Sequence, residues 1–224
     1  MAEIHGVAGE WARVKGSVLG LWPLFLGVFA AGFSAALCIN ERMLGLSLLV
    51  VSLGFVLWSL VIGLRHVERF YKGARGEEKV SGMLEALPST YHVFNDFVAG
   101  RAHVDHVVVG PSGVFAIETK CWSGRVTIED GCVLLDGQLP DRKPLVQALH
   151  EAALVKGALA KAGWVGTVTP VLAFATNTFD ARRAEVRGVV VINASELRRS
   201  FETDRVVIPP AELNRLVALM ETCS

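Results

Sequence analysis

Two uncharged apolar stretches near the N-terminus most constrain how this 224-residue chain can fold. Residues 18–39 and residues 43–64 contain no charged side chain, and each stretch is 22 residues long. At about 1.5 Å per residue, a helix of that length crosses a hydrocarbon core of roughly 30 Å. Residues 40–42 alone separate the two stretches. We therefore predict a transmembrane helical hairpin whose two ends emerge on the same side of the membrane.

Basic residues predict the orientation of this hairpin. Arg13 and Lys15 precede the first stretch, and Arg65, Arg69, Lys72 and Arg75 follow the second. The short loop between the stretches holds Arg42, which is offset by Glu41. Because basic residues accumulate on the cytoplasmic side, we expect a multi-pass protein of the bacterial inner (cell) membrane with both termini in the cytoplasm and residues 1–17 as a cytoplasmic tail. A cleaved signal peptide is the alternative for the first stretch, but its apolar region is too long and no small-x-small site follows it.

Small residues recur at four-residue spacing within the hairpin. They are Gly27, Ala31 and Ala35 in the first stretch and Ser59 and Gly63 in the second. Such spacing permits close packing of helices in a membrane. Packing within one chain and packing between chains fit the pattern equally well, so a homo-oligomer formed through these faces stays open.

The rest of the chain predicts one domain, residues 74–224, joined to the hairpin by residues 65–73. This length is enough for an independent core. Hydrophobic periodicity and turn residues predict its helices and strands. We expect helices at 74–87, 144–162, from Asn193 or Ser195 onward, and at about 210–222; we expect strands at 91–97, 103–109, 114–120, 125–129, 132–136, 168–175 and 186–192. The order indicates an α/β fold with a mixed central β-sheet flanked by helices.

Two of these strands carry the residues with the clearest chemistry. A tight turn at residues 110–113 would place Asp105 directly opposite Glu118. Opposed side chains have Cβ atoms roughly 4.5–5.5 Å apart, and like charges there are destabilising. A divalent cation such as Mg²⁺, which takes oxygen ligands, would relieve the repulsion. Lys120 lies two residues beyond Glu118 and so points to the same face of the strand.

Four blocks of sequence around this pair occur in a definite order. They are Gly73 to Glu77, Asn95-Asp96, Val104 to Gly124, and Gln147-Ala148. Together they resemble the NERD (nuclease-related) domain, which is regarded as a branch of the PD-(D/E)xK nuclease-like superfamily. The resemblance covers about residues 72–193 and implies a restriction-endonuclease-like arrangement of sheet and helices.

The resemblance also implies roles for individual residues. The implied catalytic set is Asp105, Glu118, Lys120, Glu77 and Gln147. Asp105, Glu118 and the backbone carbonyl of Thr119 would hold Mg²⁺ or Mn²⁺. Lys120 would stabilise charge on the scissile phosphate or orient the attacking water. The alternative for Lys120 is a simple surface ion pair with Glu118, which is worth little.

The remaining members of the set have ordinary alternatives of their own. Glu77 would be an accessory acid that holds a metal or water. The alternative is that Glu77 and its neighbour Glu78 lie on a solvated helix face. Gln147 would complete the site from the following helix, or it is an exposed helix residue. His103 and His106 flank Asp105, and we expect His106 to point to the opposite face of the sheet.

The resemblance implies a divalent-metal-dependent nuclease, and we expect DNA as its nucleic-acid partner and the lipid bilayer as its anchor. The charge count qualifies this expectation. From His66 onward there are 18 basic and 19 acidic residues, a net charge of 18 − 19 = −1. Nucleic-acid binders usually show a basic footprint. The alternative is therefore a catalytically inactive, membrane-tethered scaffold that binds nucleic acid or protein.

The residue types present disfavour both a channel or transporter and a zinc site. The apolar stretches contain no ionisable side chain except Cys38, whereas transport proteins carry functional polar residues within the membrane. None of the four cysteines forms a CxxC pair, so we expect no zinc site.

Overall fold

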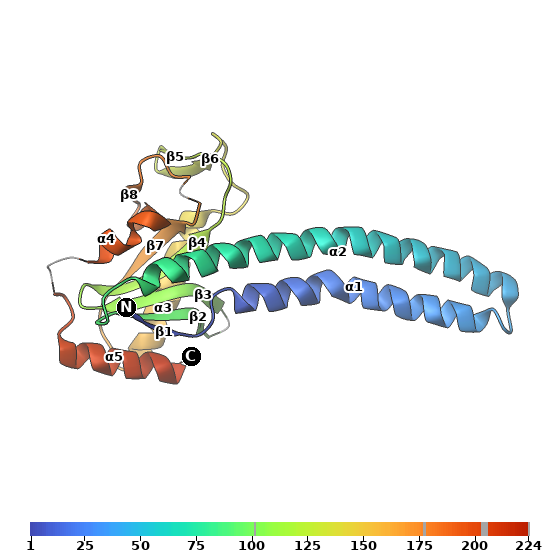
Figure 1. Ribbon diagram of the computed structural model, residues 1–224, viewed down its shortest axis with the longest axis horizontal. Helices are drawn as coiled ribbons and strands as arrows, with labels where there is room; N and C mark the ends of the chain where they lie inside the picture. Colours follow the sequence, from blue (N-terminus) through green and yellow to red (C-terminus); the bar gives the residue numbers. More distant parts are fainter. Residues whose placement is uncertain (101, 177, 203–205, 224) are drawn as a thin grey trace. The chain divides into compact units, whose positions relative to one another are not determined.

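The computed structural model describes the whole chain except residues 101, 177, 203–205 and 224 (Figure 1). The described residues form two compact units. One contains residues 1–9 together with residues 75–224, and the other contains residues 10–74. The short N-terminal segment therefore belongs to the larger unit, although residues 10–74 separate the two in sequence.

The smaller unit consists of α1 (Glu10–Leu37) and most of α2 (Arg42–Glu85). Both helices are long and apolar enough to cross a membrane, by length and composition. Only 17% of the most apolar window of each helix is buried, which is unlike the core helix of a soluble protein. The helix expected at residues 74–87 is not separate, because α2 continues without a break from the apolar stretch to Glu85.

The two helices of the smaller unit pack through small residues. A Cβ atom built on Gly63 would overlap the backbone carbonyl of Gly20, so both positions require glycine for this approach. A Cβ on Gly27 would lie 2.9 Å from Cγ2 of Val56. Ser59 is also buried here, whereas Ala35 is exposed. Gly27, Ser59 and Gly63 of the small-residue pattern thus pack within the hairpin of one chain.

A seven-stranded mixed sheet forms the centre of the larger unit. In spatial order its strands are β1 (Glu3–His5), β2 (His92–Ala99), β3 (Ala102–Gly110), β4 (Gly113–Lys120), β7 (Val168–Phe174), β9 (Val189–Asn193) and β8 (Arg183–Val186). The pairs β1–β2, β4–β7 and β7–β9 are parallel, and the other pairs are antiparallel. Strands β5 (Val126–Glu129) and β6 (Cys132–Leu135) form a separate hairpin.

Helices cover both faces of this sheet and bury two apolar layers. Helix α3 (Pro144–Lys161) and helix α5 (Pro210–Cys223) contribute to one layer, which includes Val107, Ala116 and Val155. The end of α2, the short turn η1 (Ala194–Glu196) and α4 (Leu197–Phe201) contribute to the other. The predicted α/β fold, a mixed central sheet flanked by helices, is confirmed.

Two strands differ from the expectation from sequence. Residues 186–192 were expected to form one strand, but Arg187 and Gly188 form a turn between antiparallel β8 and β9. Their φ angles are 51° and 77°, and such paired positive values belong to the tight turns that match the twist of a hairpin. Strand β1 was not expected at all, and it adds a parallel edge strand to β2.

Candidate functional site

The register of β3 and β4 places the two predicted carboxylates at the end of the same hairpin. Val109 pairs with Val114, and the ladder continues to His106 and Ile117. Asp105 and Glu118 are the next residues on each strand. By alternation they point to the face of the sheet that α3 covers, since Val107 and Ala116 lie in that layer.

Asp105 is tied to β4 by its side chain. Its Oδ2 accepts a hydrogen bond of 2.7 Å from the backbone N–H of Thr119. This contact fixes the carboxyl group of Asp105 beside Glu118, which is only 3% exposed. The contact involves the N–H of Thr119, so the predicted use of the Thr119 carbonyl as a metal ligand stays a prediction.

Lys120 links the strand pair to α3. Its Nζ donates a hydrogen bond to Oε1 of Glu118 and another, of 3.0 Å, to Oε1 of Gln147. The Lys120 side chain is 15% exposed, so its charge lies in a largely desolvated position. An ion pair in such a position differs from the exposed surface pair that sequence alone left open.

One residue that the sequence analysis did not select, Glu151, also belongs to this group. Gln147 donates through Nε2 to Oε1 of Glu151 at 3.1 Å, because residues four apart share one face of α3. Glu151 is 6% exposed. Among the described residues, Oε2 of Glu151 and Oε2 of Glu118 are buried without a hydrogen-bond partner.

Burial changes the protonation of these acids. Burial, followed by the negative charge of Glu118, raises the pKa of Glu151 from 4.5 to about 9. Burial also raises the pKa of Asp105 well above its usual value, aided by the charges of Glu118, Glu77 and Glu151. Without a cation, the group therefore keeps protons that isolated carboxyls would lose.

Glu77 reaches the same group from α2. Its pKa rises from 4.5 to about 7, first through burial and then through the charges of Asp96 and Glu118. The preceding residue allows this approach, because a Cβ atom on Gly76 would lie 2.7 Å from Cβ of Cys121. Glycine at position 76 thus lets α2 pass close to the end of β4 and brings Glu77 to the site.

His106 does not belong to this group. It points to the opposite face of the sheet, as expected, and its Nδ1 lies 2.7 Å from Oδ1 of Asn95. Burial lowers the pKa of His106 to about 3, so the ring is neutral. Its role is that of a buried polar contact beneath α2.

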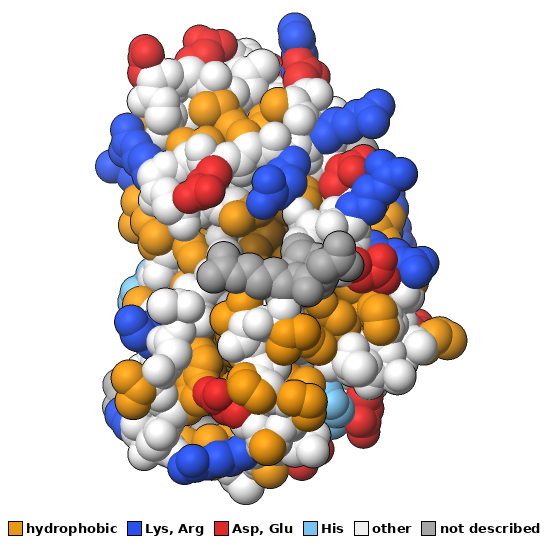
Figure 2. All heavy atoms as spheres, turned by 90° about the vertical axis from the view of Figure 1, so that its left-hand side faces the viewer, with side chains coloured by type: hydrophobic (Ala, Val, Ile, Leu, Met, Phe, Trp, Pro, Cys, Tyr) orange, Lys and Arg blue, Asp and Glu red, His pale blue; other side chains and the backbone are white. Residues whose placement is uncertain are grey.

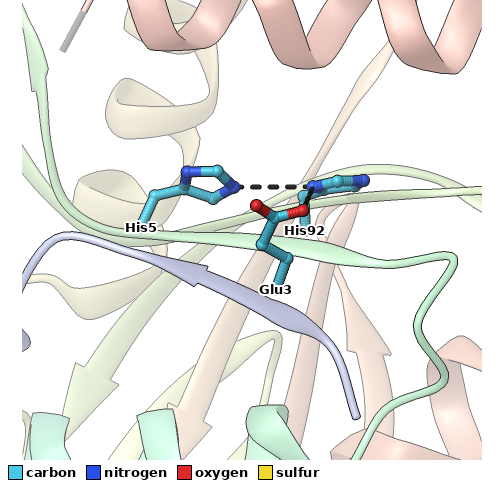
Figure 3. Close-up of side chains that lie close together, drawn as sticks. All are labelled: Glu3, His5 and His92. Carbon is cyan, nitrogen blue, oxygen red and sulfur yellow. Dashed lines mark hydrogen bonds and ion pairs between the residues drawn. The ribbon is translucent and has the colours of Figure 1, made fainter.

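The donor set of this group fits a hard divalent cation. Two buried carboxylate oxygens have no partner among the described residues, and a cation is a natural partner for them. The carboxylates do not yet converge as a tight set of ligands, however. Among the described residues, Glu3, His5 and His92 are the one group whose three potential ligand atoms lie within 4.8 Å of one another (Figure 3).

The surface charge of the domain indicates a nucleic-acid-binding site less clearly than the buried acids indicate a cation site. On the face drawn in Figure 2, Lys and Arg side chains alternate with Asp and Glu side chains and do not merge into one basic area. A pocket elsewhere on the domain gathers some of the arginines noted in the sequence. It is lined by Ala181, Arg182, Arg183, Glu196, Arg199 and Ser200.

Comparison with known proteins supplies an independent line of evidence. Residues 72–175 match the nuclease-related domain family, NERD. An uncharacterized protein of Bacillus anthracis is 34% identical over 68 residues, which are 28% of this chain and 32% of that protein. The chain therefore matches about a third of the length of this relative. No solved structure matches it significantly.

Proposed function

We propose that this chain, which carries a nuclease-related domain at residues 72–175, is a membrane-anchored nuclease that hydrolyses phosphodiester bonds of DNA. One observation carries the proposal: the nearly buried carboxylate of Glu118 is surrounded by Asp105, Lys120 and Glu151. A structural core gains nothing from such a group, because buried acids that repel one another are destabilising. Cleavage of a phosphodiester, in contrast, requires carboxylates that hold a cation and a positive charge beside the phosphate.

Asp105 and Glu118 would hold Mg²⁺ or Mn²⁺, with the Thr119 carbonyl as a proposed third ligand and Glu151 as an additional carboxylate. When bound, such a cation lowers the pKa of its water and acts as a Lewis acid toward the phosphate. Asp105 and Glu151, whose pKa values are raised, must lose their protons before they can act as ligands. Because the pKa of Glu151 is about 9, cation binding at neutral pH should release protons.

Lys120 and Glu77 would act on the substrate and on water. Lys120 carries a positive charge that Gln147 holds in place through a 3.0 Å hydrogen bond. A fixed charge at that point stabilises the negative charge that develops on a phosphate during cleavage. Glu77, whose pKa is about 7, can take up or release a proton near neutral pH, as a group that handles protons from water needs to do.

The hairpin would anchor this domain to the bilayer with both termini in the cytoplasm. Two helices of sufficient length and apolar character support the anchor, and the flanking basic residues support the orientation. The near-neutral domain should bind free DNA weakly. Confinement at a membrane raises the effective concentration of a bound substrate and offsets this weakness.

A second candidate function, a catalytically inactive scaffold, is favoured by one observation. Lys120 directly neutralises Glu118, so this part of the group can persist without a cation. In that case the domain would retain the nuclease-like fold and bind nucleic acid or protein without cleaving it. Dependence of DNA cleavage on a cation separates the two functions.

The test uses the full-length protein in detergent micelles, because β1 precedes the hairpin and a fragment starting after α1 would lack it. Plasmid and linear DNA are incubated with Mg²⁺, with Mn²⁺ or with a chelator. We expect cleavage with either cation, none with the chelator, and a loss of about 100-fold or more in Asp105→Ala. Undiminished cleavage by Asp105→Ala, or by the chelated protein, would refute the proposal.

A further inference from the structure

A second cluster of potential metal ligands lies at the edge of the sheet, away from the buried acids. Strand β1 brings Glu3 and His5, and β2 brings His92 (Figure 3). In the parallel register, Glu3 pairs with His92 and His5 pairs with Phe94. Residues two apart on one strand share a face, so all three side chains project from the same side of the sheet.

Two separations between the potential ligand atoms match those around a small, tetrahedrally coordinated ion. Nε2 of His5 lies 3.5 Å from Nδ1 of His92, and Nδ1 of His92 lies 3.3 Å from Oε2 of Glu3. All three atoms lie within 4.8 Å of one another. Bonds of about 2.0–2.1 Å in a tetrahedron imply ligand separations of roughly 3.3–3.4 Å. The separations of 3.5 Å and 3.3 Å are close to this value.

Neighbouring side chains hold His5 in the orientation that a ligand needs. Its ring stacks on Phe94 with a centroid separation of 4.3 Å. Its other nitrogen, Nδ1, lies 3.7 Å from Oε1 of Glu221 on α5. Histidine ligands usually direct their second nitrogen at a carboxylate or carbonyl, which fixes the tautomer and the ring. Glu221 is placed for that role.

The type of ligand indicates which ion would bind. Two imidazoles and one carboxylate suit Zn²⁺ and related transition metals, whereas Mg²⁺ prefers oxygen ligands alone. The site is also separate from the candidate nuclease site. His92 pairs with Val109, four residues along β3 from Asp105, which is about 13 Å at 3.3 Å per residue.

We infer that Glu3, His5 and His92 form a transition-metal site that takes Zn²⁺, with water in the fourth position. The bound ion would join β1 to β2 and so fasten the segment that precedes the first apolar helix to the edge of the sheet. Strand β1 has only three residues and few backbone hydrogen bonds to hold it. The absence of CxxC pairs suggested no zinc site, but histidines and a glutamate supply these ligands.

The test measures metal binding rather than DNA cleavage. Full-length protein without an affinity tag is stripped with a chelator in detergent, then titrated with Zn²⁺ against a competing chelator and with Co²⁺ by visible absorption. We expect one tightly bound Zn²⁺ and the intense absorption of four-coordinate Co²⁺. His92→Ala should weaken binding by about 100-fold or more, and Glu221→Gln by roughly 10–100-fold.

Two controls isolate the site. His150→Ala removes an exposed histidine of α3, and Asp105→Asn alters the buried acids; both should bind Zn²⁺ like the unmodified chain. Glu3→Gln is the second ligand variant, because the 64% exposed side chain of Glu3 can change without disturbing the fold. It should also remove the rise in thermal unfolding midpoint that Zn²⁺ gives the unmodified protein.

Unchanged Zn²⁺ affinity in both His92→Ala and Glu3→Gln would overturn the inference, as would loss of Zn²⁺ binding in Asp105→Asn. The absence of any Zn²⁺ binding by folded full-length protein would overturn it as well. None of these outcomes depends on whether the protein cleaves DNA, so failure of the zinc site and failure of the proposed nuclease function are distinguishable.

Discussion

At the scale of single residues, Glu151 has the largest consequence for the buried acids. Glu151 lies close to Glu118, and both side chains are buried, so water stabilises their negative charges little. One of the two carboxyls therefore keeps a proton in the absence of a cation. The group can respond both to pH and to a divalent ion, and the two responses oppose each other because protons and cations compete for the same oxygens.

The pH dependence of stability follows from this raised pKa. Between pH 4.5 and about 9, folded Glu151 holds a proton that the unfolded chain has lost. The metal-free protein should therefore become less stable as pH rises through this range. Glu151→Gln keeps the side-chain shape and removes the titration. We expect it to stabilise the metal-free protein at pH 9 by about 1–3 kcal/mol.

Unfolding of the metal-free protein in detergent at pH 5.5 and pH 9, followed by tryptophan fluorescence, checks this expectation. The matched control is Glu185→Gln, an exposed acid on β8. It should leave the pH dependence unchanged. If Glu151→Gln and the unmodified protein lost the same stability between pH 5.5 and pH 9, Glu151 would not be the residue that holds the buried proton.

The residue scale also shows how far sequence alone can identify a site. The ladder from Val109 and Val114 made the positions of Asp105 and Glu118 foreseeable, since strand register follows from a tight turn. Glu151 was missed because an acid on a helix is usually solvated. Its spacing of four residues from Gln147 was the available signal, but only tertiary packing reveals that this helix face is buried.

At the scale of elements, α2 positions part of the site through one close contact. Gly76 lets the helix approach the end of β4, where a larger residue would meet Cys121. Gly76→Ala should therefore cost about 1–3 kcal/mol of stability and displace Glu77. Gly82 lies on the same helix with no atom within 4 Å of a built Cβ. Gly82→Ala should stabilise the protein by about 0.5–1 kcal/mol.

Thermal unfolding of both variants in detergent provides the comparison. Opposite signs are expected, because the two substitutions have the same intrinsic helix propensity and differ only in their surroundings. Equal stabilisation by both would mean that α2 does not pass close to Cys121, and the assignment of Glu77 to the site would then fail.

Elements also differ in how well the sequence specified them. Strands β3, β4 and β7 are long, apolar and buried, so their patterns are strong. Strand β1 has three residues with two polar side chains and pairs with a strand almost 90 residues away, so no local signal marks it. The turn at Arg187 and Gly188 was hidden in an apolar run, because a single glycine within valines also fits a continuous strand.

At the scale of the whole molecule, the proposed topology places residues 40–42 and the domain on opposite sides of the membrane. In a background without native cysteines, Asn40→Cys should react with a membrane-impermeant maleimide added to intact cells. Ser89→Cys, an exposed position in the domain, should react only after the membrane is permeabilised. Labelling of Ser89→Cys in intact cells would indicate the opposite orientation, in which the domain could not reach cytoplasmic DNA.

The most direct measurement of the central claim is the rate of Mg²⁺-dependent DNA cleavage by Lys120→Ala beside Lys156→Ala in the full-length protein. Lys120 contacts both Glu118 and Gln147, whereas Lys156 is an exposed lysine of α3. We predict that Lys120→Ala lowers the rate by about 100-fold or more and that Lys156→Ala leaves it within about twofold. Equal rates in the two variants would contradict a nuclease site built on Asp105, Glu118 and Lys120.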